Sequence, residues 1–472
     1  MKLIKILCIS ILIISSSCKK EVVPSYDIVI ANTNILNIEN GKYLKGSIFI
    51  KGDTIAEIVS GKDLRNYTTE SKIDGTGKFV LPGFWDNHIH LRGGDSLFNE
   101  NKDLLPLFII NGITTVRDAG GDMTLAIHQW QKEIASGNLI GPTIYTAGPK
   151  IDGPDPIWAG SIEIDSISDI KKALDSLATL KVDFVKLYDS KINGDLYLRT
   201  IQQATKRGMI TSGHMPFSVE LGDAIESGLG AVEHLYYILK GSSSQEPEIT
   251  SAIKNNEITF WEAMSTLTKT YNDSIAAIRF NQLNDHNTFV VPTLHIGDVL
   301  SHLDEVDHKK DAYLKIMGQG IKKTYAGRIK RAKSATENAK KSRKELNAFF
   351  KTLVKSLNES NVQLLAGSDC GAYNSYVYPG ISLHKELEAL QKAGLSPLEA
   401  LKTSAYNGAR FLKKENLKGS IEVGKHADLV ILNSNPLENI SNTKDIDLVI
   451  KLGMLHNPKE IAKRYHCSDC FQ

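Results

Sequence analysis

Two histidines that lie one residue apart, His88 and His90, end an apolar stretch at residues 79–90 that reads Phe-Val-Leu-Pro-Gly-Phe-Trp-Asp-Asn-His-Ile-His. Because alternate side chains of a β-strand point to the same face, both imidazoles are predicted to project together, while Ile89 turns into packing. Neutral imidazoles fixed side by side can begin a metal site. A single His-x-His pair is a weak signal, so the other ligands must come from elsewhere in the chain.

Four further polar residues follow predicted strands at points where they could join this pair. Lys186 lies in an apolar run, His214 follows Thr-Ser-Gly, His234 ends Val-Glu-His, and Asp369 ends Ala-Gly-Ser-Asp. The histidines at positions 286, 302, 308 and 466 follow no such strand. Four histidines and an aspartate are ligands for a first-row divalent cation and suit zinc.

The elements that must position these residues are short apolar strands alternating with helical stretches. Together with the opening strand, seven further strands are predicted, at residues 113–117, 143–146, 182–187, 209–212, 231–234, 288–291 and 362–366. Eight such units predict an α/β fold with a closed (β/α)8 TIM-like barrel over residues 79–405. Reactive groups of such a barrel lie after the carboxyl ends of its strands, where these residues fall.

Two other parts of the chain are expected around the barrel. Residues 26–78 and 406–460 contain short β-branched runs separated by turn residues, and they predict a small composite β-sandwich domain built from both chain ends. The segments at about 240–285 and 294–360 exceed the needs of a barrel and read as helical insertions. These helices are expected either to form a lid over the barrel mouth or to pack there without gating it.

The composition of the 472-residue chain is that of a globular protein, with 42% hydrophobic and 23% charged residues. Lys and Arg number 56 and Asp and Glu 54, so the net charge of +2 gives no reason to expect nucleic acid as a partner. Five cysteines are too few for a disulfide framework, although Cys467 and Cys470 predict one small disulfide. The oligomeric state is left open.

The first 18 residues have the pattern of a secretory signal, with lysines at the start, an apolar run, and small residues before Cys18. The pattern resembles a bacterial lipoprotein signal, in which Cys18 would be lipidated, followed by a charged tether at 19–25. The resemblance implies a lipid-anchored protein of the bacterial cell envelope, periplasmic or in the outer membrane. Simple secretion and a retained anchor helix are the alternatives.

The chain from about Tyr26 to Ile450 resembles the amidohydrolase superfamily. The resemblance rests on the 79–90 stretch, on Gly-Ile-Thr-Thr-Val-Arg-Asp-Ala-Gly-Gly at 112–121, on Val-Glu-His and Gly-Ser-Asp, and on Gly-Ser-Ile-Glu-Val-Gly-Lys-His-Ala-Asp-Leu-Val at 419–430. Within the superfamily, the chain is most similar to the imidazolonepropionase-like and prolidase-like branch. Pro216 stands where some dipeptidase-like members have an aromatic residue, so the substrate stays open between a small molecule and a dipeptide.

The resemblance implies a site with two divalent cations, of which zinc is expected. His88, His90 and Asp369 would bind one cation, His214 and His234 the other, and Lys186 would bridge them as a carbamate made with CO2. Burial of Lys186 would favour the neutral amine that carbamylation needs. An ordinary lysine beside a single metal is the alternative.

The expected reaction is hydrolysis of an amide-like C–N bond by a metal-held hydroxide, with Asp369 moving the proton to the leaving nitrogen. A mononuclear deaminase or cyclic amidase and a non-catalytic ligand-binding lipoprotein are the competing hypotheses. Residues that could orient a substrate lie on or after strand ends, and they are Tyr237, Arg117, His295, Tyr236, Trp158 and His384.

Overall fold

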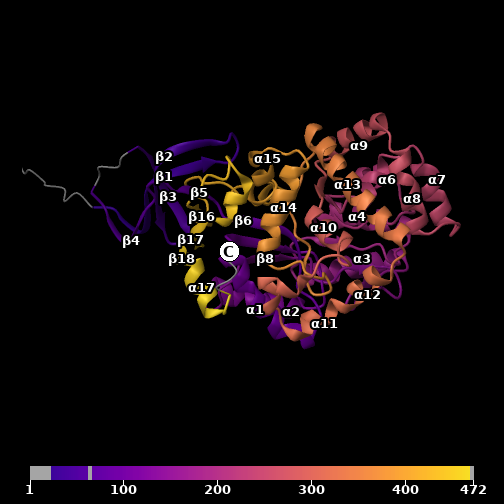
Figure 1. The fold of residues 1–472 in the computed structure, drawn as a ribbon, viewed down its shortest axis with the longest axis horizontal. Helices are drawn as coiled ribbons and strands as arrows, with labels where there is room; N and C mark the ends of the chain where they lie inside the picture. The colour runs from indigo at the N-terminus through magenta and orange to yellow at the C-terminus, as the bar shows by residue number, and fades with distance from the viewer. Residues whose placement is uncertain (1–22, 62–65, 468–472) are drawn as a thin grey trace, which may run out of the picture.

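The protein is an α/β protein in the computed structural model, which describes residues 23–61 and 66–467. Within these residues the strands form one large mixed sheet and two parallel sheets, with helices around them (Figure 1). The signal sequence, Cys18 and most of the tether lie outside the described residues, as does Cys470. The lipid anchor and the disulfide from Cys467 therefore stay predictions.

The large sheet joins the two ends of the chain. Its strands run in the order β18-β17-β16-β5-β1-β2-β3, with β4 paired to β1. The bounds are β1 Ser25–Asn37, β2 Lys42–Lys51, β3 Thr54–Ser60, β4 Thr68–Asp74, β5 Phe79–Pro82, β16 Leu429–Leu432, β17 Ile446–Lys451 and β18 Met454–His456. Isoleucine-rich faces of both parts of the chain share one buried core, which includes Ile30, Ile48, Val80, Ile431 and Ile450. These strands are rich in β-branched residues, which favour the extended conformation, and several are runs of consecutive buried residues.

The stretch expected as one strand at 79–90 is divided at Gly83. β5 pairs with β16 in the large sheet, whereas β6 (Phe84–His90) begins the parallel part of the fold. A Cβ at position 83 would come within 2.3 Å of the Thr114 side chain, so only glycine fits between the two parts. The Gly83 N–H also donates to the backbone carbonyl of Asp428.

Two parallel sheets carry the carboxyl-terminal strand ends. One has the order β15-β6-β7-β8 and the other β10-β9-β11-β12-β13-β14. Their further bounds are β7 Ile113–Asp118, β8 Thr143–Thr146, β9 Ile151–Asp152, β10 Ile162–Glu163, β11 Val185–Leu187, β12 Thr211–Gly213, β13 Ala231–Glu233, β14 Phe289–Val291 and β15 Cys370–Gly371. The strand expected at 362–366 is reduced to one parallel bridge between Leu364 and Val290.

Single backbone hydrogen bonds link these sheets. The Asn87 N–H donates to the Ala366 carbonyl at 2.9 Å, and the Asp183 N–H donates to the Thr146 carbonyl at 2.9 Å. The parallel sheets of the expected α/β fold are present, but a continuous closed ladder is not among the described residues. Closure of the eight strands into one barrel therefore stays a prediction.

Helices surround the parallel strands and fill both expected insertions. Those between and after the strands are α1 Phe98–Ile110, α2 Thr124–Ala135, α3 Ile167–Thr179, α4 Gly194–Lys206, α5 Leu221–Glu226, α14 Ile381–Lys392, α15 Pro397–Lys402, α16 Ala405–Phe411 and α17 Pro458–Arg464. The inserted ones are α6 Tyr236–Gly241, α7 Glu246–Lys254, α8 Phe260–Thr270, α9 Asp273–Asp285, α10 Leu294–Ser301, α11 Gln319–Thr324, α12 Ala326–Ser334 and α13 Glu337–Glu359. In Figure 1, α7 and α9 lie at the end of the molecule opposite the large sheet. Within the described part of the chain, none of the helices is both long and apolar enough to cross a bilayer.

A buried charge cluster ties the large sheet to the parallel strands. The Asp428 carboxylate accepts from Lys418 Nζ at 2.6 Å, lies 3.4 Å from Lys451 Nζ, and accepts from the Leu452 N–H at 2.8 Å. Lys418 also donates to Thr143 Oγ1 at the start of β8. Although burial opposes ionisation, the two lysines hold the pKa of Asp428 below its usual value.

Replacing Asp428 with Asn should lower the free energy of unfolding by about 3–5 kcal/mol at pH 7, because two buried ammonium groups lose their partner. The exposed Asp175, paired with Lys171, offers the control, and Asp175→Asn should cost less than about 1 kcal/mol. Urea denaturation followed by circular dichroism measures both changes.

The difference in stability between wild type and Asp428→Asn should also depend on pH. Because the pKa of Asp428 is lowered on folding, its stabilisation is fully present above the unfolded pKa of about 3.9 and is lost as the pH falls toward the folded pKa. The difference between wild type and Asp428→Asn should therefore shrink below about pH 4. An equal difference at pH 7 and pH 3 would contradict this account.

Candidate metal centre

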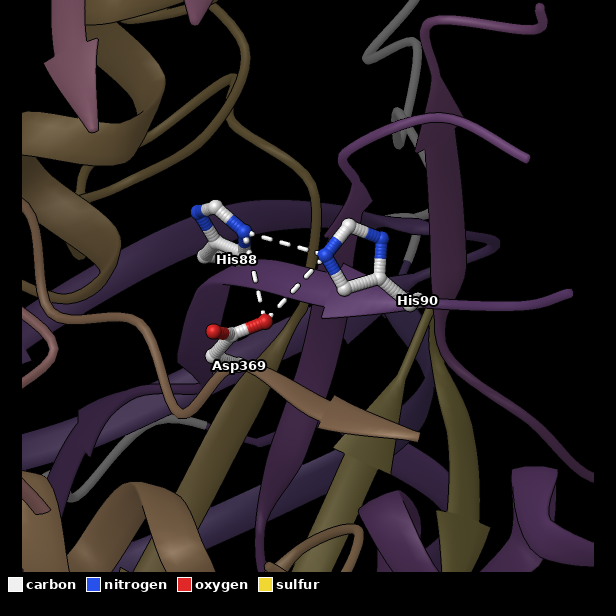
Figure 2. A group of neighbouring side chains, drawn as sticks. All are labelled: His88, His90 and Asp369. Carbon is white, nitrogen blue, oxygen red and sulfur yellow. Dashed lines mark hydrogen bonds and ion pairs between the residues drawn. The ribbon is translucent and has the colours of Figure 1, made fainter. Parts of the chain in front are cut away.

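Three buried side chains from two distant segments meet at the end of β6. His88 Nε2 and His90 Nε2 lie 3.3 Å apart, and Asp369 Oδ1 lies 3.5 Å from the first and 3.1 Å from the second. Figure 2 shows both rings directed toward the carboxylate, with the histidines on one strand and Asp369 just before β15. One nitrogen of each ring and one carboxylate oxygen therefore face a common point, as ligands of one cation would.

The close approach of the two segments follows from their small residues and backbone bonds. The Asp369 N–H donates to the His88 carbonyl at 2.7 Å. A Cβ at Gly367 would lie 2.5 Å from the His88 Cβ, so a larger residue would push the segments apart. Ser368 bonds to Asp86 through both its hydroxyl and its N–H. Asp369 itself has a left-handed backbone, with φ of 57°, which turns its side chain toward the histidines.

The other two histidines lie beside this group. The ring centroids of His214 and His234 are 4.8 Å apart, and those of His234 and His88 are 5.2 Å apart. His234 Nε2 also lies 4.0 Å from Asp369 Oδ2. Each of the four histidines predicted as a ligand is thus in one cluster with Asp369, although they come from three different strand ends.

The Nδ1 atoms of three rings have hydrogen-bond partners that orient these rings. They are the Gly120 carbonyl for His90 at 3.3 Å, Asp189 Oδ1 for His214 at 3.1 Å and Thr293 Oγ1 for His234 at 2.7 Å. His88 Nδ1 lies 3.6 Å from Glu233 Oε2, which is too far for a hydrogen bond. A second partner of this kind fixes the tautomer and the orientation of a metal-ligating histidine. The Nε2 atoms are left to face the centre of the cluster.

Lys186, at the middle of β11, lies in the same buried layer. Its Nζ contacts the Glu233 carboxylate, which also bonds to Arg117 at 3.1 Å and accepts from the Ser212 hydroxyl at 2.6 Å. Burial, followed by the nearby charges of Lys150 and Arg117, holds the pKa of Lys186 well below its usual value. The lowered pKa favours the neutral amine, which is the form that carbamylation requires.

Burial also sets the charge of the histidines and of Asp369. It lowers the pKa of all four histidines, that of His234 to about 3, so the rings are neutral. For Asp369, burial favours the acid, but the hydrogen bond to His90 and nearby positive groups hold its pKa below the usual value. Asn374 Nδ2 also donates to Asp369 Oδ1 at 2.8 Å. Neutral imidazoles and an ionised carboxylate are the forms that bind a divalent cation.

A cavity of about 180 Å³ lies beside this cluster. Its lining includes His214, His234 and Asp369, and also Tyr236 and Arg328. A substrate in this cavity would lie next to the carboxylate and two of the rings. The donor set consists of oriented imidazole nitrogens, a carboxylate and a neutral amine, and it fits one or two first-row divalent cations.

Among the residues expected to orient a substrate, Tyr236 lines this cavity, whereas Tyr237 lies behind His214. The Tyr237 hydroxyl donates to Asp189 Oδ2 at 2.7 Å and thus supports the carboxylate that orients His214. The Trp158 ring packs against the Arg92 guanidinium, whose carbon lies 4.1 Å from the centroid of the ring. Tyr237 and Trp158 therefore act on the site through neighbours.

Arg117, His295 and His384 have other environments. Arg117 is fully buried between Phe184 and Phe411, with its Nε bonded to the Asn87 carbonyl, and it holds Glu233 beneath the histidines. The backbone N–H of His295 donates to the Glu386 carboxylate. The His384 ring is buried between Thr443 and the Asn111 carbonyl. Contact with a substrate in the cavity is not expected from these three residues.

Several residues of the site had no place in the sequence prediction, namely Asp189, Glu233, Thr293, Asn374 and Arg328. Glu233 directly precedes His234, and Asp189 follows Lys186 by three residues, so their proximity to ligands was a usable signal. Asn374 and Arg328 lie in irregular or inserted segments, where no strand periodicity indicates direction. Only packing shows that they reach Asp369 and the cavity.

Comparisons with known proteins agree with this geometry. The profile of the amidohydrolase family matches residues 79–455, and the chain belongs to this family. The family and the buried ligand cluster together define a hydrolase fold with a candidate metal site.

Particular relatives are distant. A 5-methylthioadenosine/S-adenosylhomocysteine deaminase of Caldanaerobacter subterraneus subsp. tengcongensis is 25% identical over 423 residues, which cover 87% of this chain and 85% of the deaminase. A crystal structure of a Xaa-Pro dipeptidase with bound methionine has a TM-score of 0.68 at 19% identity, covering 91% of this chain and 99% of the dipeptidase. A structure of a bottromycin amidohydrolase has a TM-score of 0.72 at 19% identity, covering 93% of this chain and 90% of the amidohydrolase. These two structures share the fold.

Asp189→Asn should weaken binding of Zn²⁺ about 10- to 100-fold, because the charge that orients His214 is lost. Competition with a chelator of known affinity measures the change. Asp103→Asn, at an exposed position on α1, should leave the affinity unchanged. Equal affinities of the Asp189→Asn and wild-type proteins would show that Asp189 does not support a metal ligand.

Proposed function

We propose that this protein is a metal-dependent amidohydrolase that hydrolyses an amide-like C–N bond in a small molecule or a small peptide, with two Zn²⁺ ions per chain. The observation that carries the proposal is the convergence of four oriented, neutral imidazoles, Lys186 and ionised Asp369 beside one cavity. Within the proposal, the eight parallel strand segments form one distorted TIM-like barrel around this cluster.

His88, His90 and Asp369 would hold one cation, His214 and His234 the other, and carbamylated Lys186 would bridge them. When bound, the cations would activate water and polarise the substrate carbonyl at neutral pH. Asp369 Oδ1 is held by His90 and Asn374, which leaves Oδ2 to accept a proton and deliver it to the leaving nitrogen. Tyr236 and Arg328, which line the same cavity, would contact the substrate.

A mononuclear deaminase or cyclic amidase is the second candidate. Two observations favour it: the tightest group contains only His88, His90 and Asp369, and the Lys186 amine lies against Glu233. The similarity to a deaminase over most of the chain adds support. In this reading, Lys186 stays unmodified and pairs with a carboxylate.

Counting metal separates the two candidates. Protein prepared with excess Zn²⁺ and freed of unbound ions should contain two equivalents, and Lys186→Ala should retain one or none, because the bridging ligand is lost. Mass spectrometry of intact protein in bicarbonate buffer should also show an added carbamate on wild type but not on Lys186→Ala. A fully active preparation with one equivalent would contradict the binuclear site and support the mononuclear candidate.

A second measurement on the same preparations tests the role of Asp369. Asp369→Asn should lower kcat on a panel of amides, dipeptides and lactams by at least about 100-fold, since general acid–base catalysis contributes that much. His286→Ala, at an exposed histidine, is the control and should keep full turnover. Metal-replete wild type without any Asp369-dependent turnover would instead favour a non-catalytic, ligand-binding lipoprotein.

We further propose that the protein is attached to the bacterial cell envelope through a lipid on Cys18. The support is the sequence pattern of residues 1–18 alone, because these residues lie outside the described part of the structure. Nothing in the described fold requires a membrane partner beyond this anchor.

Cys18→Ser should abolish labelling by a fatty-acid analogue in a bacterial host and release the protein from the membrane fraction, because the thiol that carries the lipid is removed. Cys8→Ser, within the same leader, is the matched control and should keep both label and attachment. Membrane attachment that persists in Cys18→Ser would indicate a retained leader helix.

A further inference from the structure

A second cavity adjoins the one at the candidate metal centre. It has a volume of about 440 Å³, within the range of pockets for small ligands. The two cavities share the wall residues Tyr236, Gly297, Leu300, Arg328, Asn347 and Phe350. His214, His234 and Asp369 line only the inner cavity, whereas Arg331 and Arg343 line only the outer one. A ligand longer than the inner cavity would therefore extend past Arg328 toward Arg331 and Arg343.

The outer cavity is strongly cationic. Arg328 and Arg331, three residues apart on α12, and Arg343 on α13 all line it. Within residues 23–61 and 66–467, no aspartate or glutamate lines this cavity, and none forms an ion pair with any of the three guanidinium groups. Like charges placed close together on one helix are unfavourable, so the free energy of this arrangement would be lowered by a bound anion.

The three arginines are not equally engaged elsewhere. Arg328 donates to the Tyr373 carbonyl and to Asn374 Oδ1, both at 2.8 Å, and so helps to hold the segment after Asp369. Arg343 has only a long bond, 3.4 Å, to the Leu300 carbonyl. Arg331 is exposed. The guanidinium groups of Arg331 and Arg343 are thus available to a ligand without loss of a structural role.

Apolar side chains form much of the remaining wall, together with the polar Ser301 and Asn347. Trp261, on α8, is 67% exposed at this cavity, and Phe350 and Leu303 line it as well. An exposed tryptophan beside guanidinium groups suits a ligand that combines an apolar or aromatic group with an anion. Planar guanidinium groups bind carboxylate and phosphate oxygens in two-pronged hydrogen bonds.

We propose that Arg328, Arg331 and Arg343 form an oxyanion-binding subsite, which selects substrates that carry a carboxylate or phosphate group on an apolar portion remote from the bond to be cut. The proposal rests on the proposed function for the meaning of that bond, but the anion site itself exists independently of turnover. It assigns a recognition role to α12 and α13, which lie in the inserted segment at 294–360.

Three probes of matched shape test the subsite: 4-phenylbutyrate, 4-phenylbutylphosphonate and the neutral 4-phenylbutanamide. Their binding to the full metal-loaded protein is followed by calorimetry and by the fluorescence of Trp261. At least one anion should bind about tenfold or more tightly than the amide, as charge-assisted hydrogen bonds imply. The tighter of the two anions identifies a carboxylate or a phosphate as the preferred group. Equal binding of all three probes would overturn the proposal.

Variants separate the arginines from the cations as the source of any preference. Arg331→Glu combined with Arg343→Glu should abolish the preference for the anion, and the milder Arg343→Gln should reduce it in a protein with an unchanged melting temperature. Lys330→Glu reverses a single charge on α12 outside the cavity and should preserve most of the preference. The preference should also survive removal of metal by a chelator. Its persistence in the double variant, or its loss with the metal, would overturn the proposal.

Failure of the anion subsite and failure of the proposed hydrolase activity give different results. In Asp369→Asn, the anion preference should remain although turnover is lost. If the wild-type protein hydrolyses none of the substrates but keeps the preference for anions, the amidohydrolase proposal is rejected and the subsite remains. Hydrolysis without any preference for anionic substrates would reject the subsite alone.

Discussion

The candidate site depends on the contact between β6 and the segment that ends in Asp369. The Asp369 N–H donates to the His88 carbonyl, and Gly367 leaves room for the His88 side chain, so two segments about 280 residues apart in the chain lie in direct register. A slip of one residue in β6 would turn both imidazoles away from the carboxylate. The ligand geometry is therefore a consequence of strand register.

Charge balance is the second constraint on this buried layer. Lys186, Arg117 and Glu233 are all fully buried, and the Glu233 carboxylate contacts both the Lys186 amine and the Arg117 guanidinium beside His88. Burying unpaired charges is costly, so these groups are stable there only as a connected network that also orients the ligands. Asp189 and Asn374 play the corresponding parts for His214 and Asp369. The fold thus gives His90, His214, His234 and Asp369 each a hydrogen-bond partner that fixes its direction.

The site and the fold differ in how far sequence could predict them. His88 and His90 were predictable as a pair because a strand repeats every two residues, and the cluster of four histidines with Asp369 followed from their positions after strand ends. The division at Gly83 was missed because β5 and β6 form one continuous apolar run, and only their different partners separate them. Likewise, Arg117 was expected near a substrate, but its alternation on β7 directs it into the buried layer.

Local patterns along the chain by themselves indicated most strands and helices, the family and the candidate metal ligands, because these depend on periodicity and on short motifs. Only the tertiary structure decided which residues orient those side chains and which ones line the inner cavity. It alone also showed that three arginines of an inserted segment line the outer cavity together. Such contacts join residues from separate elements, and the direction of a side chain in an irregular or inserted segment is set by packing against distant neighbours. No local spacing in the sequence records that packing.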